Sequence, residues 1–289
     1  MHALRHLRWI VALLLLACAT GAHAVPMRVL HPPQESDADL RTRYPLAVLR
    51  LALERSGERV QVAPAPVRAS QERLLRLLEE GRDLDVAWTM NTAARERRLR
   101  AVPFPIDRGL IGWRVLLVRR DALPRFAEGA DPRRTLAQLL GVQGHDWPDL
   151  AILRANGLRV VPTPRYESLF AMLERGHVDY VARSVSEAGD ELAARPGAPL
   201  AIEPRLLLHY PAALQFFVHP RNDALARALE TGLERAQRDG SLQRLFDATY
   251  GDALSALALQ RRHVVRMHNP LQAPGMPLAR RDLWYQPQP

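Results

Sequence analysis

Apolar residues in the first third of the chain fall into three short runs, separated by two stretches with helical spacing. The runs have the length of buried strands, and the stretches between them carry leucines three or four residues apart. In order they are a strand at 27–30, a helix over about 46–56, a strand at 60–63, a helix over about 70–81 and a strand at 85–88. This alternation favours an α/β sheet.

The middle of the chain repeats the same alternation. Strand-like runs lie at 113–118, 139–143, 159–161, 178–181 and 215–218, and helical stretches lie at 148–155, 166–173 and 225–236. Pro148 suits the first turn of its helix, and Asp149 favours the positive end of the helix dipole. Two α/β sets joined by extended strands predict two lobes, and ligand pockets often lie at such an interface.

The two sets also predict where one lobe ends and the other begins. We expect residues 25–114 and 214–250 to form lobe 1, with the 225–236 helix packed on it, and residues 115–213 to form lobe 2. The pattern changes from Gly251 onward, over residues 251–289, and residues 263–289 are rich in proline and arginine and carry an aromatic Leu-Trp-Tyr sequence before the last four residues. Those aromatic residues argue against a disordered tail, so we expect this C-terminal extension to pack on one lobe.

The first 24 residues have the three parts of a secretory signal peptide. Two arginines precede an apolar run, Trp9–Ala17, and Ala22-His23-Ala24 is a small-x-small cleavage site. The run is too short to cross a bilayer. Cys18, the single cysteine, offers a lipoprotein alternative, although the leucine two residues before it fits such a site poorly. We therefore expect cleavage after Ala24 and a protein of the periplasm.

Composition argues against several kinds of chemistry. The formal net charge is +9, and all 40 residues counted as lysine or arginine are arginines. Without lysine there is no P-loop lysine, no Schiff-base lysine and no Ser-x-x-Lys nucleophile. The sequence also lacks a Gly-x-Ser-x-Gly elbow, a His-Glu-x-x-His motif and metal-type histidine spacing. We expect no enzyme activity, cofactor or metal, and no nucleic acid partner, because no basic run is interleaved with aromatic residues.

Four stretches together resemble the bacterial extracellular solute-binding proteins of family 3. Residues 77–86 are similar to the family's helix-Gly-x-x-Asp-strand passage, and residues 166–180 repeat the helix-Gly-x-x-Asp spacing. Residues 92–105 contain a Thr-x-x-Arg segment and Pro-Phe-Pro, and residues 225–250 contain Asp-Gly-Ser between two helices. The likeness covers roughly residues 27–250 and depends on the order and spacing of the motifs. It implies an α/β, two-lobed periplasmic-binding-protein (type 2) fold with a ligand cleft between the lobes.

The resemblance also implies a carboxylate-binding arginine at Arg95, because this residue follows Thr92 in the Thr-x-x-Arg segment. A guanidinium can hold a carboxylate through two parallel hydrogen bonds. Arg97 and Arg98 are alternatives in a neighbouring register, and a solvated helix face would also account for this run of arginines.

Many family members have an acidic residue after the second Gly-x-x-Asp strand, where it holds a ligand amine, but this chain has Arg183 in that region. Arg183 either lies near the cleft or forms an ion pair with Glu187, one helical turn on. With Arg95, Arg183 and the helix start at Pro148 in one crevice, we expect a net positive cleft that prefers a solute with a carboxylate.

His145, Asp146 and Trp147 are further candidates for ligand contacts. They lie at a strand-to-helix junction, where α/β crevices form and helix-start amides bind anions. A helix cap for Asp146 and a core position for Trp147 are the simpler alternatives. Tyr44, like Trp88 and Tyr210, is a weaker candidate for an aromatic ring on which a ligand could stack. All three residues would also suit the core.

Together these features predict a periplasmic solute-binding protein that captures a small anionic or zwitterionic solute, either amino-acid-like or a carboxylate. It would serve an ABC importer through a membrane permease, or a sensor, and we expect a monomer. The alternative is a periplasmic interaction or signalling protein that keeps the fold without transporting a small solute. Arg183, which replaces the usual acid, and the aromatic C-terminal extension both favour the alternative.

Overall fold

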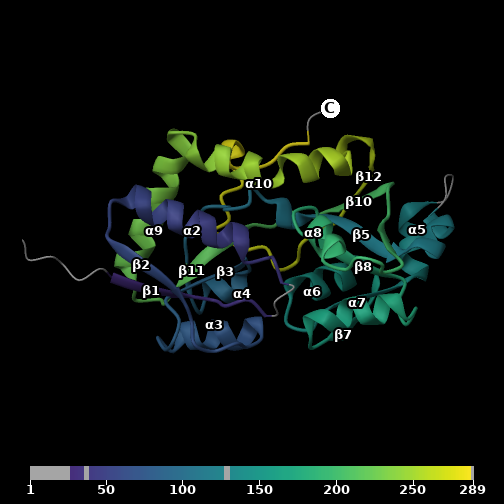
Figure 1. Cartoon of the computed structure of the whole chain (residues 1–289), viewed down its shortest axis with the longest axis horizontal. Coiled ribbons are helices and arrows are strands. Elements are labelled where there is room, and N and C mark those ends of the chain that lie inside the picture. Colours follow the sequence, from purple (N-terminus) through teal and green to yellow (C-terminus); the bar gives the residue numbers. More distant parts are fainter. Residues whose placement is uncertain (1–26, 36–38, 127–130, 288–289) are drawn as a thin grey trace, which may run out of the picture.

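The computed structural model describes residues 27–35, 39–126 and 131–287, which form two α/β lobes side by side (Figure 1). The predicted signal peptide lies outside the described residues. Each lobe is built around strands that run through its centre, with helices on the outside (Figure 1). The predicted fold class, a two-lobed α/β protein, is therefore confirmed.

Lobe 1 contains two small groups of strands. Its strands are β1 (Met27–His31), β2 (Val60–Pro64), β3 (Val86–Met90), β4 (Arg100–Ala101) and β11 (Leu214–Val218). β1 and β2 are parallel, whereas β11 runs antiparallel between β3 and β4. The Asp85 backbone amide donates to the carbonyl oxygen of Leu30 at 2.9 Å, which brings the two groups together just before β3.

The helices of lobe 1 follow from their apolar stripes. They are α2 (Arg43–Ser56), α3 (Gln71–Glu79), α4 (Ala93–Glu96), α9 (Asp223–Arg238) and α10 (Ser241–Leu257). α2 ends at Gly57, whose φ of 89° suits glycine, and the Asn222 side chain caps α9 by accepting from the Leu225 amide at 3.1 Å. α9 packs closely on α2, because a Cβ atom at Gly232 would lie 1.8 Å from the carbonyl oxygen of Ala52.

Lobe 2 contains one seven-stranded sheet of mixed direction. Its strands are β5 (Trp113–Arg119), β6 (Leu140–Gly144), β7 (Arg159–Thr163), β8 (Tyr180–Ser184), β9 (Leu200–Ile202), β10 (Leu206–His209) and β12 (His263–Arg266). They lie in the order β12-β10-β5-β8-β6-β7, and β9 also pairs with β5. Its helices are α5 (Pro132–Gln138), α6 (Pro148–Ala155), α7 (Tyr166–Glu174) and α8 (Ala188–Ala193), with a 3₁₀ segment at Arg120–Phe126.

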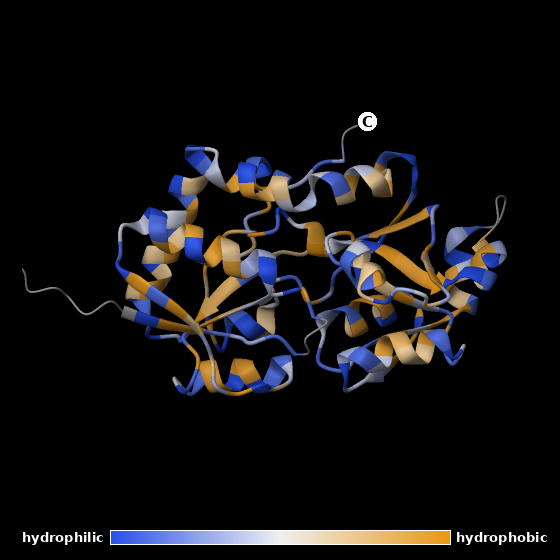
Figure 2. Cartoon of the chain, viewed as in Figure 1, coloured by the Kyte–Doolittle hydropathy of each residue, from blue (hydrophilic) through white to orange (hydrophobic). Residues whose placement is uncertain are grey.

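The apolar residues of both lobes gather on the strands and on the helix faces that cover them (Figure 2). In β5, Val115, Leu116, Leu117 and Val118 are all fully buried, as expected for a central strand with neighbours on both faces. The predicted helical stripe of α7 is also buried, from Tyr166 to Leu173.

The chain passes between the lobes near Gly112 and again near Ala212. A 3₁₀ turn, Leu110–Gly112, leads into β5, and a Cβ atom at Gly112 would lie 2.2 Å from the carbonyl oxygen of Tyr210. Only glycine allows the two crossing segments to approach this closely.

The C-terminal extension contacts both lobes, whereas we expected it to pack on one. β12 lies parallel to β10 at the edge of the lobe 2 sheet. Farther along, the Leu271 carbonyl oxygen accepts from the amide of Ala93 in lobe 1, and the Tyr285 amide donates to the carbonyl oxygen of Arg108 at 2.7 Å. The free edge of β10 accounts for the difference, because a short Val-Val strand satisfies its backbone groups before the chain returns.

The last long helix also exceeds its prediction. We expected lobe 1 to end at residue 250, but α10 continues to Leu257. Leu254 and Leu257 are buried, so apolar contacts carry the helix past Gly251.

Candidate functional site

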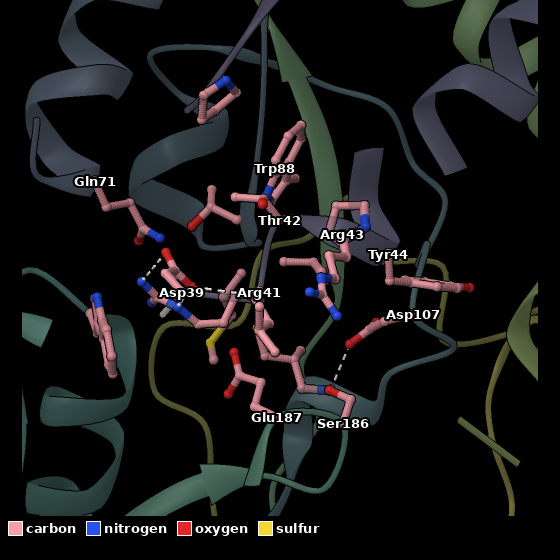
Figure 3. A pocket seen from close by; sticks show the side chains of 18 of the residues that line it. Asp39, Arg41, Thr42, Arg43, Tyr44, Gln71, Trp88, Asp107, Ser186 and Glu187 are labelled. Carbon is pink, nitrogen blue, oxygen red and sulfur yellow. Dashed lines mark hydrogen bonds and ion pairs between the residues drawn. The ribbon is translucent and has the colours of Figure 1, made fainter. Parts of the chain in front are cut away.

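A cavity of about 370 Å³ lies between the two lobes (Figure 3). Lobe 1 supplies Pro32, Pro33, Glu35 and residues 39–45, the start of α3 and strand β3, and lobe 2 supplies the starts of β5, α6 and α8. Its walls are rich in charged and aromatic side chains. The volume suits a solute the size of an amino acid.

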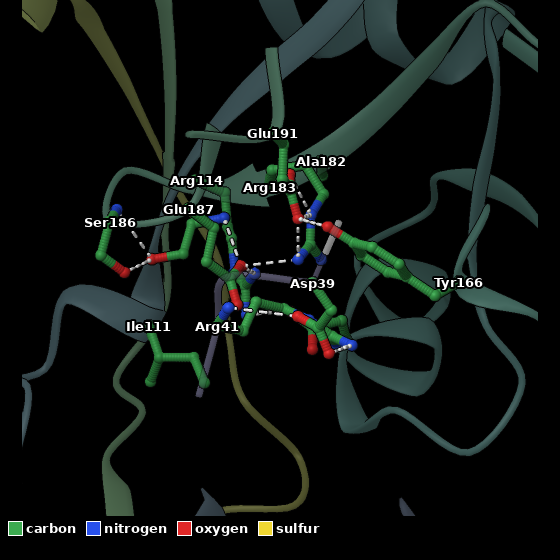
Figure 4. A network of polar contacts seen from close by, with 12 residues as sticks. Asp39, Arg41, Ile111, Arg114, Tyr166, Ala182, Arg183, Ser186, Glu187 and Glu191 are labelled. Atoms are coloured by element: carbon green, nitrogen blue, oxygen red, sulfur yellow. Dashed lines mark hydrogen bonds and ion pairs between the residues drawn. The ribbon is translucent and has the colours of Figure 1, made fainter. Parts of the chain in front are cut away.

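Arg183 is the centre of a buried ion network in lobe 2 (Figure 4). Its Nε donates to both carboxylate oxygens of Glu191, at 2.9 and 2.8 Å, and Nη2 lies 2.8 Å from Oε2 of Glu187. The Tyr166 hydroxyl also donates to Glu191, at 2.9 Å. Burial alone would lower the pKa of Arg183, but the two carboxylates raise it well above its ordinary value. Arg183 is therefore a permanent, fully paired charge.

A second buried arginine, Arg114, lies next to this network on β5. Its guanidinium contacts Asp149 at 2.5 Å and donates to the Tyr210 hydroxyl at 3.0 Å. Its Nη1 lies 3.6 Å from the carboxylate of Glu187, which also contacts Arg183. The Tyr210 hydroxyl in turn donates to Asp149. Glu187 thus joins the two arginines in one network.

Arg41 brings a third guanidinium to the cavity, from lobe 1. It forms a two-pronged pair with Asp39, with distances of 2.7 Å from Nε and 2.9 Å from Nη2, and lies 3.2 Å from Glu35. Its central carbon is 4.2 Å from the centre of the Tyr166 ring and 5.3 Å from that of Trp147. Arg41 therefore reaches across the cavity to aromatic rings of lobe 2.

The charge of the cavity wall is opposite to the net positive cleft that we expected. The residues that line it carry seven carboxylates and four guanidinium groups, a formal excess of three negative charges. The expectation was wrong because it counted Arg95, Arg183 and the helix start at Pro148 and no carboxylate of the wall. The neighbouring acids, which neutralise the buried arginines, come from other elements and have no common motif.

Asp107 is a deeply buried carboxylate of the cavity wall that forms no ion pair with a described residue. It accepts backbone N–H groups of Gly109 at 3.0 Å and Ile111 at 2.7 Å. Burial raises the pKa of this carboxyl to about 6. Tyr44 lies beside it at one end of the cavity (Figure 3), and its hydroxyl donates to the carbonyl oxygen of Ile106 at 2.9 Å.

Arg95 lies next to the cavity but does not line it. Its Nη1 donates to the Thr89 hydroxyl at 2.6 Å and to the Met90 carbonyl at 3.0 Å, and Nη2 donates to the Gln71 side chain at 2.7 Å. No carboxylate in the described part of the chain forms an ion pair with it, and burial lowers its pKa to about 10. Its role as a ligand contact stays a prediction.

The three residues of the junction before α6 have different surroundings. Trp147 and Arg183 both line the cavity, and the guanidinium lies 4.8 Å from the ring centre. Asp146 accepts from the Glu72 amide at 3.0 Å, so it caps α3 across the lobes rather than α6. His145 is exposed and is not part of the wall. Of the six predicted site residues, Tyr44, Trp147 and Arg183 thus line one cavity.

Sequence reasoning missed most of the ion network. Arg114 carried a usable signal, because a charged residue directly inside an apolar strand needs a buried partner. Glu191 lies one helical turn beyond Glu187, on the same face as the partner that we considered for Arg183. Asp39 and Arg41 had no such signal, since they lie in an irregular polar segment.

Two negative observations concern the described residues only. They contain no group of three or more histidine, cysteine, aspartate or glutamate side chains arranged to hold a metal ion. None of the helices in this part of the chain has the length and apolar character needed to span a membrane.

The fold is similar to solved structures of two-lobed binding proteins. An arginine periplasmic binding protein of Salmonella typhimurium matches with a TM-score of 0.58 and 15% identity over 78% of this chain and 100% of that chain. The GluR0 ligand-binding core of Nostoc punctiforme, in complex with glutamate, matches with 0.56 and 14% over 78% and 99%. A histidine kinase sensor domain with similarity to periplasmic binding proteins matches with 0.58 and 17% over 78% and 96%.

Neither a protein-family model nor a curated protein matches the sequence. At these identities the structural likeness establishes the fold and nothing finer. The chain has the type 2 periplasmic-binding-protein fold, as the resemblance implied.

Proposed function

We propose that this protein is a receptor for a small zwitterionic solute, which it encloses between its two lobes. The observation that carries the proposal is the cavity itself, with its volume of about 370 Å³ and its wall of paired charges and aromatic rings. A cavity of this volume between two lobes, with charged and aromatic side chains on its wall, suits capture of a small charged molecule rather than of a polymer.

The wall favours a zwitterion over an anion. Its formal excess of three negative charges would repel a solute that carries only carboxylates. A zwitterion adds a positive charge to this wall, and its own carboxylate can pair with an arginine. The structurally similar arginine-, glutamine- and lysine-binding proteins are described with zwitterionic ligands, which agrees with this choice.

The receptor acts in the periplasm after removal of residues 1–24, and passes its solute to a membrane permease or presents it to a sensor. We propose that it works as a monomer and that it closes by bending at the two crossing segments near Gly112 and Ala212. Mass spectrometry of the exported protein tests the first step. A mature chain that begins at Val25 is expected, whereas a lipid on Cys18 or an intact Met1 would contradict it.

A thermal-shift screen tests the binding function. Solutes that bind only the folded state must stabilise it, by about 2.7 kcal/mol at 100 times the dissociation constant. The screen should contain amino acids, dicarboxylates and amines at millimolar concentration. At least one zwitterion is expected to raise Tm by about 5–10 °C. The absence of any shift across all three classes would contradict the proposal.

The second candidate is a periplasmic interaction or signalling protein that keeps the fold without capturing a solute. The saturation of Arg95 and Arg183 by the chain's own groups favours it, as does the C-terminal extension that contacts both lobes. The same thermal-shift screen separates the two functions, because the second predicts no response to any small solute.

A further inference from the structure

The arginines on the cavity wall differ in how fully the chain itself engages them. Arg41, Arg114 and Arg183 each contact at least one carboxylate at 2.8 Å or less. Arg43, the fourth, makes no ion pair and no side-chain hydrogen bond with any described residue. It is therefore the one guanidinium on the described wall whose donors remain available to a solute.

The carboxylates show the same division. Glu35 and Asp39 pair with Arg41, Asp149 with Arg114, and Glu187 and Glu191 with Arg183. Asp107 accepts two backbone amides. Within the part of the chain that the structure describes, Asp190 alone among the seven has neither an ion pair nor a side-chain hydrogen bond.

These two unengaged charges belong to opposite lobes. Arg43 is the first residue of α2 in lobe 1, and Asp190 lies in the first turn of α8 in lobe 2. Both side chains are exposed, so water solvates them until a solute enters. A molecule that pairs with both would tie the lobes together, which is what a receptor that closes on its ligand needs.

The end of the cavity beside Arg43 also contains groups that suit a solute with an ammonium group. Arg43, Tyr44 and Asp107 lie at the same end of the cavity (Figure 3). The Tyr44 and Tyr250 rings are 4.6 Å apart there, and both residues line the wall. Aromatic faces and a buried carboxylate both favour a positive group over a neutral or negative one.

We propose that Arg43 binds the carboxylate and Asp190 the ammonium group of the zwitterionic solute. This inference rests on the proposed function and names the residues that select the ligand class. It differs from the resemblance, which implied Arg95 for the carboxylate. The Nη donors of Arg95 are already engaged by Gln71, Thr89 and Met90.

Isothermal titration of four proteins tests the assignment: wild type, Arg43→Ala, Asp190→Asn and Arg50→Ala. Arg50 is the matched control, because it is an exposed arginine of the same helix that does not line the cavity. The probes are L-arginine, L-glutamine and L-glutamate, with agmatine and glutarate as analogues. Agmatine is arginine without its carboxylate, and glutarate is glutamate without its ammonium group.

Wild type is expected to bind at least one of the three amino acids, and to bind agmatine far more weakly than arginine or glutarate far more weakly than glutamate. Arg43→Ala should raise the dissociation constant of that amino acid about 30-fold or more. It should also reduce the difference in affinity between arginine and agmatine. Asp190→Asn should reduce the difference in affinity between glutamate and glutarate. Arg50→Ala should bind as wild type does.

The possible failures are distinguishable. If wild type binds an amino acid and both cavity variants retain its affinity, the proposed function stands and the assignment of Arg43 and Asp190 is wrong. If none of the five probes binds wild type, the proposed function is contradicted, and the assignment is contradicted with it.

Discussion

The contact between α2 and α9 makes a sharp prediction for one glycine. A Cβ atom at Gly232 would lie 1.8 Å from the carbonyl oxygen of Ala52 and 2.6 Å from its carbonyl carbon. Both are backbone atoms, so no side chain can rotate away, and the two helices must move apart by more than 1 Å to reach ordinary contact. Gly232→Ala is therefore expected to destabilise the protein, although alanine is the better helix former.

The magnitude follows from two opposing effects. Alanine in place of glycine inside a helix gains about 1 kcal/mol from helix propensity. Overpacking in a close-packed core costs about 1–3 kcal/mol and more when backbone must shift. We expect a net loss of about 2 kcal/mol or more, which lowers Tm by roughly 4–8 °C for a protein of this size.

Gly251 supplies a matched control in α10. A Cβ atom there meets no heavy atom within 4 Å, so Gly251→Ala has the higher helix propensity of alanine without a steric cost. It should raise Tm by roughly 2–4 °C. Thermal unfolding of the three proteins by circular dichroism, at one protein concentration, measures the difference. If Gly232→Ala proves as stable as Gly251→Ala, the helices do not pack at this distance and the architecture of lobe 1 is wrong.

Three further predictions concern the cavity and the C-terminal extension. Burial raises the pKa of Asp107 from 3.8 to about 6, so its contribution to stability is full below pH 4 and falls by up to about 3 kcal/mol as pH rises to 6. Urea unfolding between pH 4 and 7 should show Asp107→Asn lacking this decline, and parallel pH profiles would contradict the burial of the carboxyl. Glu191→Gln leaves Arg183 with one full ion pair in place of two, and we expect a loss of about 3 kcal/mol or more in the same assay; a loss under about 1 kcal/mol would mean that Glu187 suffices. Trp284 packs on Gly109, where a Cβ atom would lie 2.5 Å from its ring, so Trp284→Ala should lower Tm by roughly 4–8 °C; an unchanged Tm would show that the extension is not anchored there.

Periodicity in the sequence determined most of the secondary structure. The leucine stripe of α3 and the apolar run of β5 were predictable because side chains on one face of a helix or in a buried strand must all be apolar. The repeated α/β alternation already predicted two lobes, and the resemblance added the type 2 fold, since the order of glycine and aspartate motifs follows the chain rather than its contacts. β10 and β12 were missed; β12 has only two apolar residues between a histidine and an arginine, too few to show a pattern.

Only the tertiary structure decided the chemistry of the cavity. Arg183 was a candidate from its position, but its neutralisation by Glu187 and Glu191 depends on the direction in which α8 leaves the sheet. Asp146 was a candidate ligand contact, with a cap on its own helix as the alternative, and instead it caps α3 of the other lobe, because the lobes meet there. The net charge of the wall depends on pairs that lie far apart in sequence, so no local pattern could give its sign.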